Sequence, residues 1–224
     1  MKYYLSSYKI GNRARKLKSM VPKGKKLGFI PNAMDHIPFE QRQESNGRNI
    51  KYLTDLGIRI ELLDLKKYFG REKALRKKIN SLGGVWVRGG NTFVLRQAMR
   101  LSGFDTILKE IATSEDGDNF FYGGFSAGGC VLSPSLKNLT IVDNPKLMPY
   151  GRRKVVWEGL GLINYVFMPH YKSDHPESKD IDREIARCKR LGIKFKPVRD
   201  GEVIIIESKT TKKKKPGKGK GKRK

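Results

Sequence analysis

The sequence has few of the residues that mark disulfide-rich, metal-binding or membrane proteins. Its 224 residues include only two cysteines, Cys130 and Cys188, and three histidines. Two cysteines cannot form a disulfide framework, and neither has the spacing of a metal ligand set. No apolar run approaches the ~20 residues of a membrane-spanning helix, and the N-terminal "MKYYLSSYKI" lacks the apolar stretch and cleavage site of a secretory signal. These absences predict a cytoplasmic protein with reduced thiols and with no metal, cofactor or membrane partner.

Acidic residues are scarce beside basic ones. There are 48 lysines and arginines against 22 aspartates and glutamates, for a net charge of +26. Residues 209–224, "KTTKKKKPGKGKGKRK", hold ten of the basic residues with no acid and no apolar residue. Such a segment is expected to be a disordered tail. It can attract polyanions in a salt-sensitive way, but it has no aromatic residue for base stacking, so we expect at most weak, nonspecific polyanion binding.

Residues 1–208 alternate short apolar runs with amphipathic stretches and are expected to form a single catalytic domain. The runs that predict strands are 2–8, 25–33, 58–65, 83–90, 119–125, 164–171 and 201–206. The stretches with helical spacing are 38–55, 71–81, 91–101, 103–113 and 177–191. This alternation predicts a three-layer α/β fold, with a mostly parallel sheet and helices on both faces. Ligands of such sheets bind beyond the carboxyl ends of the strands.

A serine among small residues follows one of these strands. Residues 124–128, "GFSAG", match the G-x-S-x-G pattern of a nucleophile elbow, in which a tight strand-to-helix turn exposes Ser126. Amides at the start of the following helix can then stabilise an oxyanion. The alternative is a glycine-rich turn that only packs a helix against the sheet. The sequence lacks the G-x-G-x-x-G and G-x-x-x-x-G-K-[ST] patterns of nucleotide-binding loops.

Two other predicted strands end in candidate catalytic residues at the same edge of the predicted sheet. The glycine pair before Asn91 allows close backbone approach, and the Gly90 amide can supply an oxyanion donor. Alternatively, this segment is a simple turn in which Asn91 caps a helix. His170 follows the strand 164–171 and is suited to act as a general base, with His175 as a rival. The segment "HYKSDH" has no recognised metal-ligand spacing.

The sequence does not single out the carboxylate that would orient the histidine. Asp143 lies between Ser126 and His170 in the sequence, while Asp174 and Glu177 lie close to the histidine. The alternative for each of them is a solvated residue in a loop. Cys130 comes one helical turn after Ser126, so we interpret it as a buried, inert thiol rather than a nucleophile.

Taken together, these segments resemble the peptidase E family of serine peptidases, the aspartyl dipeptidases. The resemblance covers nearly all of residues 1–208. It rests on five ordered segments: "LSSY", "LGFIPNA", "GGNTFVL", "GGFSAGG" and "PHY" followed by "SDHPES". It implies a flavodoxin-like fold of the class I glutamine amidotransferase type, and a serine peptidase that cleaves small peptides, with Asp-X dipeptides as candidates.

The resemblance also implies roles for single residues. Ser126 would be the nucleophile and His170 the general base, while the amides of Gly90 and Ala127 would form the oxyanion hole. Asp143 is the nearest match to the acid of the triad. Asn91 would contact the substrate, and Arg183, or alternatively Arg187, would hold its aspartate carboxylate.

Two other functional hypotheses fit the same sequence. They are a cyanophycinase-like or ester-cleaving hydrolase, and a non-catalytic module that binds polyanions through its tail. The protein is expected to be a monomer or a homodimer.

Overall fold

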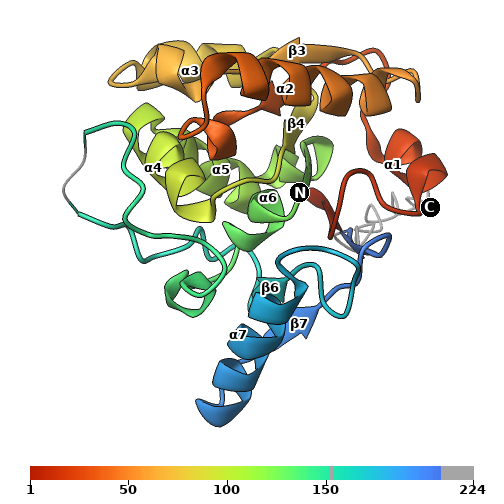
Figure 1. Cartoon of the computed structure of the whole chain (residues 1–224). Helices are drawn as coiled ribbons and strands as arrows, with labels where there is room; N and C mark the ends of the chain where they lie inside the picture. The colour runs from red at the N-terminus through yellow and green to blue at the C-terminus, as the bar shows by residue number, and fades with distance from the viewer. Residues whose placement is uncertain (152–153, 208–224) are drawn as a thin grey trace, which may run out of the picture.

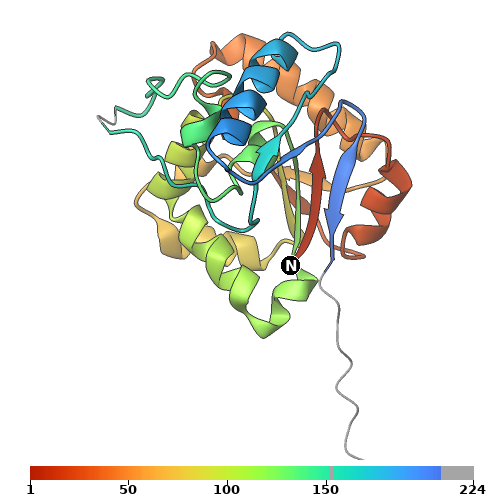
Figure 2. The same cartoon turned by 90° about the horizontal axis from the view of Figure 1, so that it is seen from below.

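The computed structural model describes residues 1–151 and 154–207, so the lysine-rich tail predicted for residues 209–224 lies outside the described residues. A six-stranded sheet forms the centre, in the order β3-β2-β4-β5-β1-β8. Its strands are β1 (Lys2–Ser6), β2 (Leu27–Ile30), β3 (Ile60–Leu62), β4 (Gly84–Val87), β5 (Phe121–Phe125) and β8 (Val203–Ile206). All neighbours are parallel except β8, which runs antiparallel beside β1 (Figure 2). The predicted mostly parallel α/β sheet is confirmed.

Alternating side chains along the strands build a core on each face of the sheet. In β1, Tyr3 and Leu5 belong to one buried cluster and Tyr4 to the other. In β4, Val85 is in the first cluster and Trp86 in the second. This follows from the period-two geometry of a strand, in which successive side chains point to opposite faces. A sheet that is buried on both faces requires helices on both.

Two groups of helices supply this cover. Leu17 of α1 (Ala14–Met20) and Leu53 of α2 (Phe39–Thr54) belong to one cluster. The other contains buried residues of α3 (Glu72–Asn80), α4 (Thr92–Ser102), α5 (Phe104–Thr113), α6 (Ala127–Cys130) and α7 (Ser178–Arg190). Short 3₁₀ turns lie at Asn32–Met34, Leu65–Tyr68, Glu115–Asn119 and Lys137–Leu139. All five predicted helices are present, and α1 was not anticipated.

One strand prediction needs correction. The strand predicted over 164–171 was expected to deliver His170 to the edge of the central sheet. Instead, β6 (Val166–Met168) pairs in parallel with β7 (Phe195–Pro197) in a separate two-stranded sheet. A parallel pair needs a crossover connection, and α7 provides it, at the opposite end of the molecule from α2 and α3 (Figure 1).

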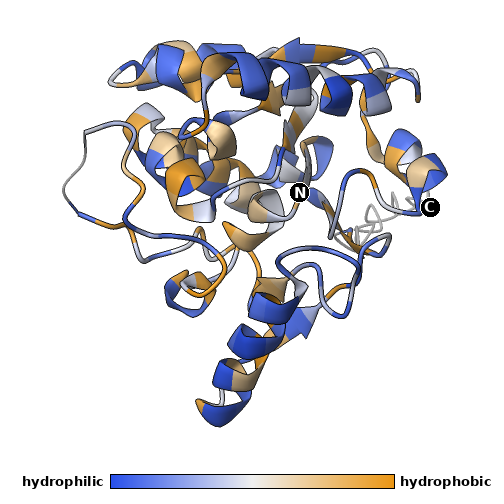
Figure 3. Cartoon of the chain, viewed as in Figure 1, coloured by the Kyte–Doolittle hydropathy of each residue, from blue (hydrophilic) through white to orange (hydrophobic). Residues whose placement is uncertain are grey.

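The surface helices are amphipathic. In α7 the apolar residues Ile181, Ile185 and Cys188 are buried, at the spacing of one helix face. Figure 3 accordingly shows hydrophobic and hydrophilic residues alternating along this helix. Within the residues that the structure describes, no helix combines the length and apolar character needed to cross a bilayer.

Candidate active site

Ser126 occupies a strained turn between β5 and α6. Its backbone angles are φ 47° and ψ −117°, in the left-handed half of the map that non-glycine residues rarely enter. The turn is held from both sides. The Ser126 N–H donates to the carbonyls of Ser6 and Ser7 at 3.3 and 3.2 Å, and its carbonyl accepts from the N–H groups of Gly129 and Cys130 at 2.8 and 3.0 Å. Strain held by surrounding structure is typical of functional sites, and this is the turn expected of a nucleophile elbow.

Close packing explains the glycines beside this serine. A Cβ atom on Gly128 would lie 2.3 Å from the carbonyl oxygen of Val87, so α6 can approach β4 only without a side chain there. A Cβ atom on Gly89 would lie 2.9 Å from Cβ of Ser126. The β4 end and the elbow are therefore in contact.

His170 is fixed by contacts with residues distant in sequence. Its φ is 58°, and its backbone N–H donates to Oγ of Ser7 at 2.7 Å. Its ring Nδ1 lies 2.7 Å from Oδ1 of Asp200, which also accepts from the Ser7 hydroxyl at 2.7 Å. The Asp200 N–H in turn donates to Oγ of Ser173 at 2.8 Å. Ser7 and Asp200 therefore hold both the backbone and the ring of the histidine.

Ser126 and His170 line the same pocket, whose volume is about 150 Å³. Its other lining residues are Tyr8, Met34, Arg88, Gly89, Gly90, Phe125, His175 and Glu177. The structure thus brings together the predicted serine, the predicted histidine and the glycine pair. Four of the lining residues, Tyr8, Met34, Arg88 and Phe125, were not anticipated as site residues.

The structure does not bring Asp143 to the histidine. Its Oδ2 accepts a hydrogen bond from the backbone N–H of Thr92 at 2.9 Å, at the start of α4. Burial raises the pKa of Asp143 to about 6, although the hydrogen bond from Thr92 acts in the opposite direction. The position predicted for Asp143, behind the His170 ring, is occupied by Asp200.

Sequence reasoning missed Asp200, although a signal for it exists. The candidate acids Asp143, Asp174 and Glu177 all lie between the serine and the histidine or just after the histidine in the sequence. An antiparallel strand begins at the edge where parallel strands end, so residues just before β8 reach the same edge as Ser126. Asp200 precedes β8 by three residues.

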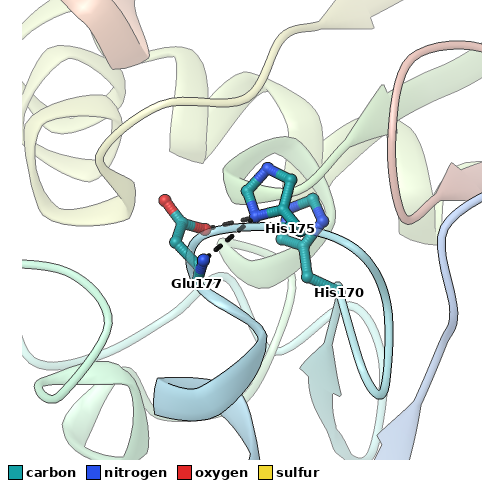
Figure 4. Close-up of side chains that lie close together, drawn as sticks. All are labelled: His170, His175 and Glu177. Carbon is teal, nitrogen blue, oxygen red and sulfur yellow. Dashed lines mark hydrogen bonds and ion pairs between the residues drawn. The ribbon is translucent and has the colours of Figure 1, made fainter.

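Two further titratable groups crowd the histidine. The His175 ring stacks on the His170 ring, with centroids 3.6 Å apart and an interplanar angle of 8°. Oε2 of Glu177 lies 3.8 Å from Nε2 of His170, and the Glu177 N–H donates to Nδ1 of His175 at 3.2 Å (Figure 4). Asp174, the other candidate acid, is exposed, and no contact with His170 is found for it among the described residues.

This crowding keeps the histidine neutral. Burial and then the neighbouring His175 lower the pKa of His170 to about 4, although Asp200 acts in the opposite direction. Burial, and then the charges of Asp143, Asp180 and Asp200, raise the pKa of Glu177 to about 7. At neutral pH the imidazole is therefore able to accept a proton.

His170, His175 and Glu177 are also the residues to test for a metal site. One ligand atom of each lies within 4.8 Å of the other two. However, the two imidazole rings are nearly parallel, so their in-plane lone pairs run side by side rather than converging on one point. Nδ1 of His170 is already bonded to Asp200. This arrangement fits a metal ion poorly.

The predicted substrate-binding side chains lie elsewhere. Arg183 pairs with Asp180 at 2.7 Å on the exposed face of α7, one turn apart, and does not line the pocket. Arg187 contacts Oγ1 of Thr140 at 3.2 Å.

Asn91 is engaged as a helix cap. Its Oδ1 accepts from the N–H groups of Phe93 and Val94 at 2.9 and 3.0 Å, and its amide donates to the carbonyl of Asn144 at 3.1 Å. Cys130 is buried, and burial raises the pKa of its thiol well above the usual range, as befits an inert thiol.

Comparison with known proteins finds similar peptidases. The model of peptidase family S51 matches residues 9–214. The uncharacterized peptidase Lin0382 of Listeria innocua is 28% identical over 186 residues, which are 82% of this chain and 81% of that protein. The uncharacterized peptidase Lmo0363 of Listeria monocytogenes is 28% identical over 193 residues, which are 83% of this chain and 84% of that protein.

Two solved structures share the fold. A crystal structure of a candidate peptidase E protein from Listeria monocytogenes superposes with a TM-score of 0.68 at 22% identity, and covers 93% of this chain and 98% of that one. A peptidase from an acI-B1 Actinobacterium gives a TM-score of 0.63 at 15% identity, and covers 92% and 83%. The resemblance to peptidase E is thereby confirmed: the chain belongs to peptidase family S51 and is a peptidase.

Proposed function

We propose that this peptidase is of the serine type and cleaves small peptides, with Ser126 as nucleophile, His170 as general base and Asp200 as the acid that orients the base. The observation that carries the proposal is the contact of 2.7 Å between Asp200 and Nδ1 of His170, on a ring that shares its pocket with Ser126. A nucleophile, a base and an orienting carboxylate form the constellation by which such sites are recognised, whatever their order in the sequence.

Each group has a defined role in the reaction. The hydroxyl oxygen of Ser126 attacks the scissile carbonyl carbon, and Nε2 of His170 takes the hydroxyl proton. Asp200 accepts a hydrogen bond from Nδ1–H, which fixes the tautomer that leaves Nε2 free, and stabilises the imidazolium that forms. The imidazolium then donates its proton to the leaving amine as the C–N bond breaks. Water hydrolyses the acyl-enzyme with His170 again as base.

The oxyanion hole is assigned to the backbone N–H groups of Gly90 and Ala127. Gly90 lines the pocket of Ser126, and Ala127 follows the serine directly. No hydrogen-bond acceptor for either N–H is found in the described part of the chain. Unpaired donors at this position support the role, because preorganised N–H groups stabilise the charge that develops in the transition state.

Replacement of the nucleophile tests the proposal. Ser126→Ala should lower kcat by about 10⁶-fold, as expected when a nucleophile is removed from such a site, and a serine-directed fluorophosphonate should label the unaltered protein at Ser126 alone. Activity should be measured on Asp-X dipeptides, other dipeptides and simple esters, so that peptidase and esterase activity are separated. Ser19→Ala is the control, since Ser19 is exposed and lies outside the pocket. Undiminished turnover in pure Ser126→Ala protein would contradict the mechanism.

A further inference from the structure

Ser7, the residue after the end of β1, contacts all three members of the proposed triad and is itself fully buried. Its backbone carbonyl accepts from the N–H of Ser126 at 3.2 Å. Its hydroxyl bonds to both His170 and Asp200, which lie 163 and 193 residues away in the sequence. One residue at a strand end thus joins the segments that carry the nucleophile, the base and the acid.

The hydroxyl of Ser7 belongs to a closed ring of hydrogen bonds. The backbone N–H of His170 donates to Oγ of Ser7 at 2.7 Å, and the Ser7 hydroxyl donates to Oδ1 of Asp200 at 2.7 Å. The same carboxylate oxygen lies 2.7 Å from Nδ1 of His170. A serine hydroxyl has one proton to donate, and the bond that it accepts from the His170 backbone directs this proton to Asp200. The ring therefore fixes the imidazole relative to its own backbone.

Asp200 needs this constraint because it is not deeply buried. Its side chain is 22% exposed, and it lies in the turn that precedes β8. The N–H of Asp200 donates to Oγ of Ser173 at 2.8 Å, which holds the backbone but leaves the carboxylate free to rotate. The Ser7 hydroxyl fixes that rotation, because it donates to the oxygen that faces the imidazole. Without this bond, water can compete with His170 for the carboxylate.

Ser7 also supports both strained turns of the site. Ser126 and His170 have φ angles of 47° and 58°, which are rare for residues other than glycine. Each turn directs its backbone N–H to Ser7, that of Ser126 to the carbonyl and that of His170 to the hydroxyl. Strained backbone persists where surrounding contacts determine it, and Ser7 supplies one such contact to each turn.

We infer that Ser7 is a positioning residue of this active site, whose hydroxyl aligns the carboxylate of Asp200 with the imidazole of His170. This inference rests on the proposed serine peptidase function. Ser7 does not line the pocket of Ser126, so its effect passes through His170 and not through contact with the substrate. Alignment of the base acts on proton transfer in the transition state, and its loss lowers kcat without weakening substrate binding.

Removal of the hydroxyl tests this assignment by kinetics. Ser7→Ala should lower kcat on a cleaved dipeptide by about 10–100-fold, as expected for a small misplacement of a catalytic group, while KM changes by less than about twofold. Ser102→Ala is the matched control, because Ser102 is also buried and its hydroxyl bonds to the carbonyl of Ala98 within α4, outside the pocket. Undiminished kcat in folded Ser7→Ala protein, or an equal loss in Ser102→Ala, would overturn the proposal.

A pair of variants of similar shape separates the hydroxyl from the volume of the side chain. Threonine and valine are both β-branched, and only threonine keeps a hydroxyl. The kcat of Ser7→Thr should exceed that of Ser7→Val by at least about tenfold, since the added methyl group affects both alike. Equal kcat in the two folded variants would mean that the hydroxyl does not position the base.

NMR on inactive protein separates this inference from the identity of the nucleophile. In full-length Ser126→Ala protein at neutral pH, the ¹⁵N shifts of the His170 ring report which nitrogen holds the proton. With Ser7 present, the proton should lie on Nδ1, which faces Asp200. With Ser7→Val in the same background, the two tautomers should be mixed. An identical tautomer in both proteins would overturn the role of Ser7, whereas absence of fluorophosphonate labelling at Ser126 contradicts the nucleophile alone.

Discussion

The two sides of the Ser126 pocket are built in different ways. The elbow side, from β4, β5 and α6, depends on residues that are close in sequence and on backbone packing between neighbouring strands. The histidine side depends on side-chain hydrogen bonds between distant segments, above all the bonds of Ser7 and Asp200 to His170. The first side is therefore sensitive to added volume, and the second to the loss of single polar atoms.

The electrostatics of the two sides also differ. On the histidine side, two imidazoles and the carboxyl groups of Glu177 and Asp200 lie together. Burial is the main cause that lowers the pKa of both imidazoles and raises the pKa of Glu177. On the β4 side, Arg88 is the charged group that lines the pocket. A substrate that spans the pocket thus meets titratable groups on one side and a permanent cation on the other.

The largest effect is expected on the histidine side, from Asp200→Asn. The amide cannot stabilise the imidazolium and favours the wrong tautomer of His170, and a comparable change elsewhere lowers kcat by about 10⁴-fold. Steady-state kinetics on a cleaved dipeptide measure the loss. Circular dichroism should show an unchanged fold, because Asn retains an acceptor for the Ser7 hydroxyl. Loss of less than tenfold would mean that Asp200 does not orient the base.

Added volume should break the elbow side. Gly128→Ala places a methyl group against the carbonyl of Val87 and forces α6 away from β4, which should destabilise the protein by about 1–3 kcal/mol. Because the nucleophile moves with α6, kcat should fall by up to about 10²-fold. Urea unfolding and kinetics measure the two effects.

Gly47→Ala is the control for this substitution. Gly47 lies within α2 with no atom close to its Cβ position, so alanine there should stabilise by about 0.5–1 kcal/mol. Equal behaviour of the two variants would show that the elbow does not depend on close packing.

The stacked histidine should tune the base. His175→Phe keeps a ring over His170 but removes the group that, after burial, lowers its pKa most. The pKa of His170 should therefore rise from about 4, while burial still holds it below the usual histidine value. The acid limb of kcat/KM, which depends on neutral His170, should move to higher pH. An unchanged pH profile and an unchanged NMR titration of His170 would exclude this coupling.

Asp143→Asn should have the smallest effect on activity. Asp143 bonds to the Thr92 N–H, and Asn can accept the same bond. Its folded-state pKa is raised to about 6, so ionisation opposes folding as pH rises through that value. The variant should therefore keep its kcat, match the unaltered protein in stability only at about pH 3, below the ordinary aspartate pKa of 3.8, and exceed it at pH 8. A large loss of kcat would return Asp143 to the catalytic site.

Much of the fold was predictable because it depends on local patterns. Short apolar runs identified all six strands of the central sheet, and helical spacing identified α2, α3, α4, α5 and α7. In contrast, β6 was recognised as a strand but assigned to the wrong sheet, and its partner β7 was not predicted. A strand's period indicates which faces are buried, but it does not name the partner strand.

The active site was likewise predictable only where it depends on local sequence patterns. The small residues around Ser126, the glycine pair before Asn91 and the position of His170 after a strand led to one pocket. The carboxylate and the arginine were not predictable, because the candidates for them lie between Ser126 and His170 or in the residues that follow His170. Arg183 faces solvent and Asp143 bonds to α4, while Asp200 and Arg88 reach the pocket from other strand ends.

The sequence by itself thus determined the elements of this protein and the turn that strains Ser126, since both depend on residues close together in the chain. Only the tertiary structure decided which groups meet there. His170 is held by Ser7 across 163 residues and by Asp200 across 30, and Arg88 is buried beside α2, where Ser45 and Asn46 accept its hydrogen bonds. Contacts of that range follow from how strands and crossovers pack, and no local spacing in the chain encodes them.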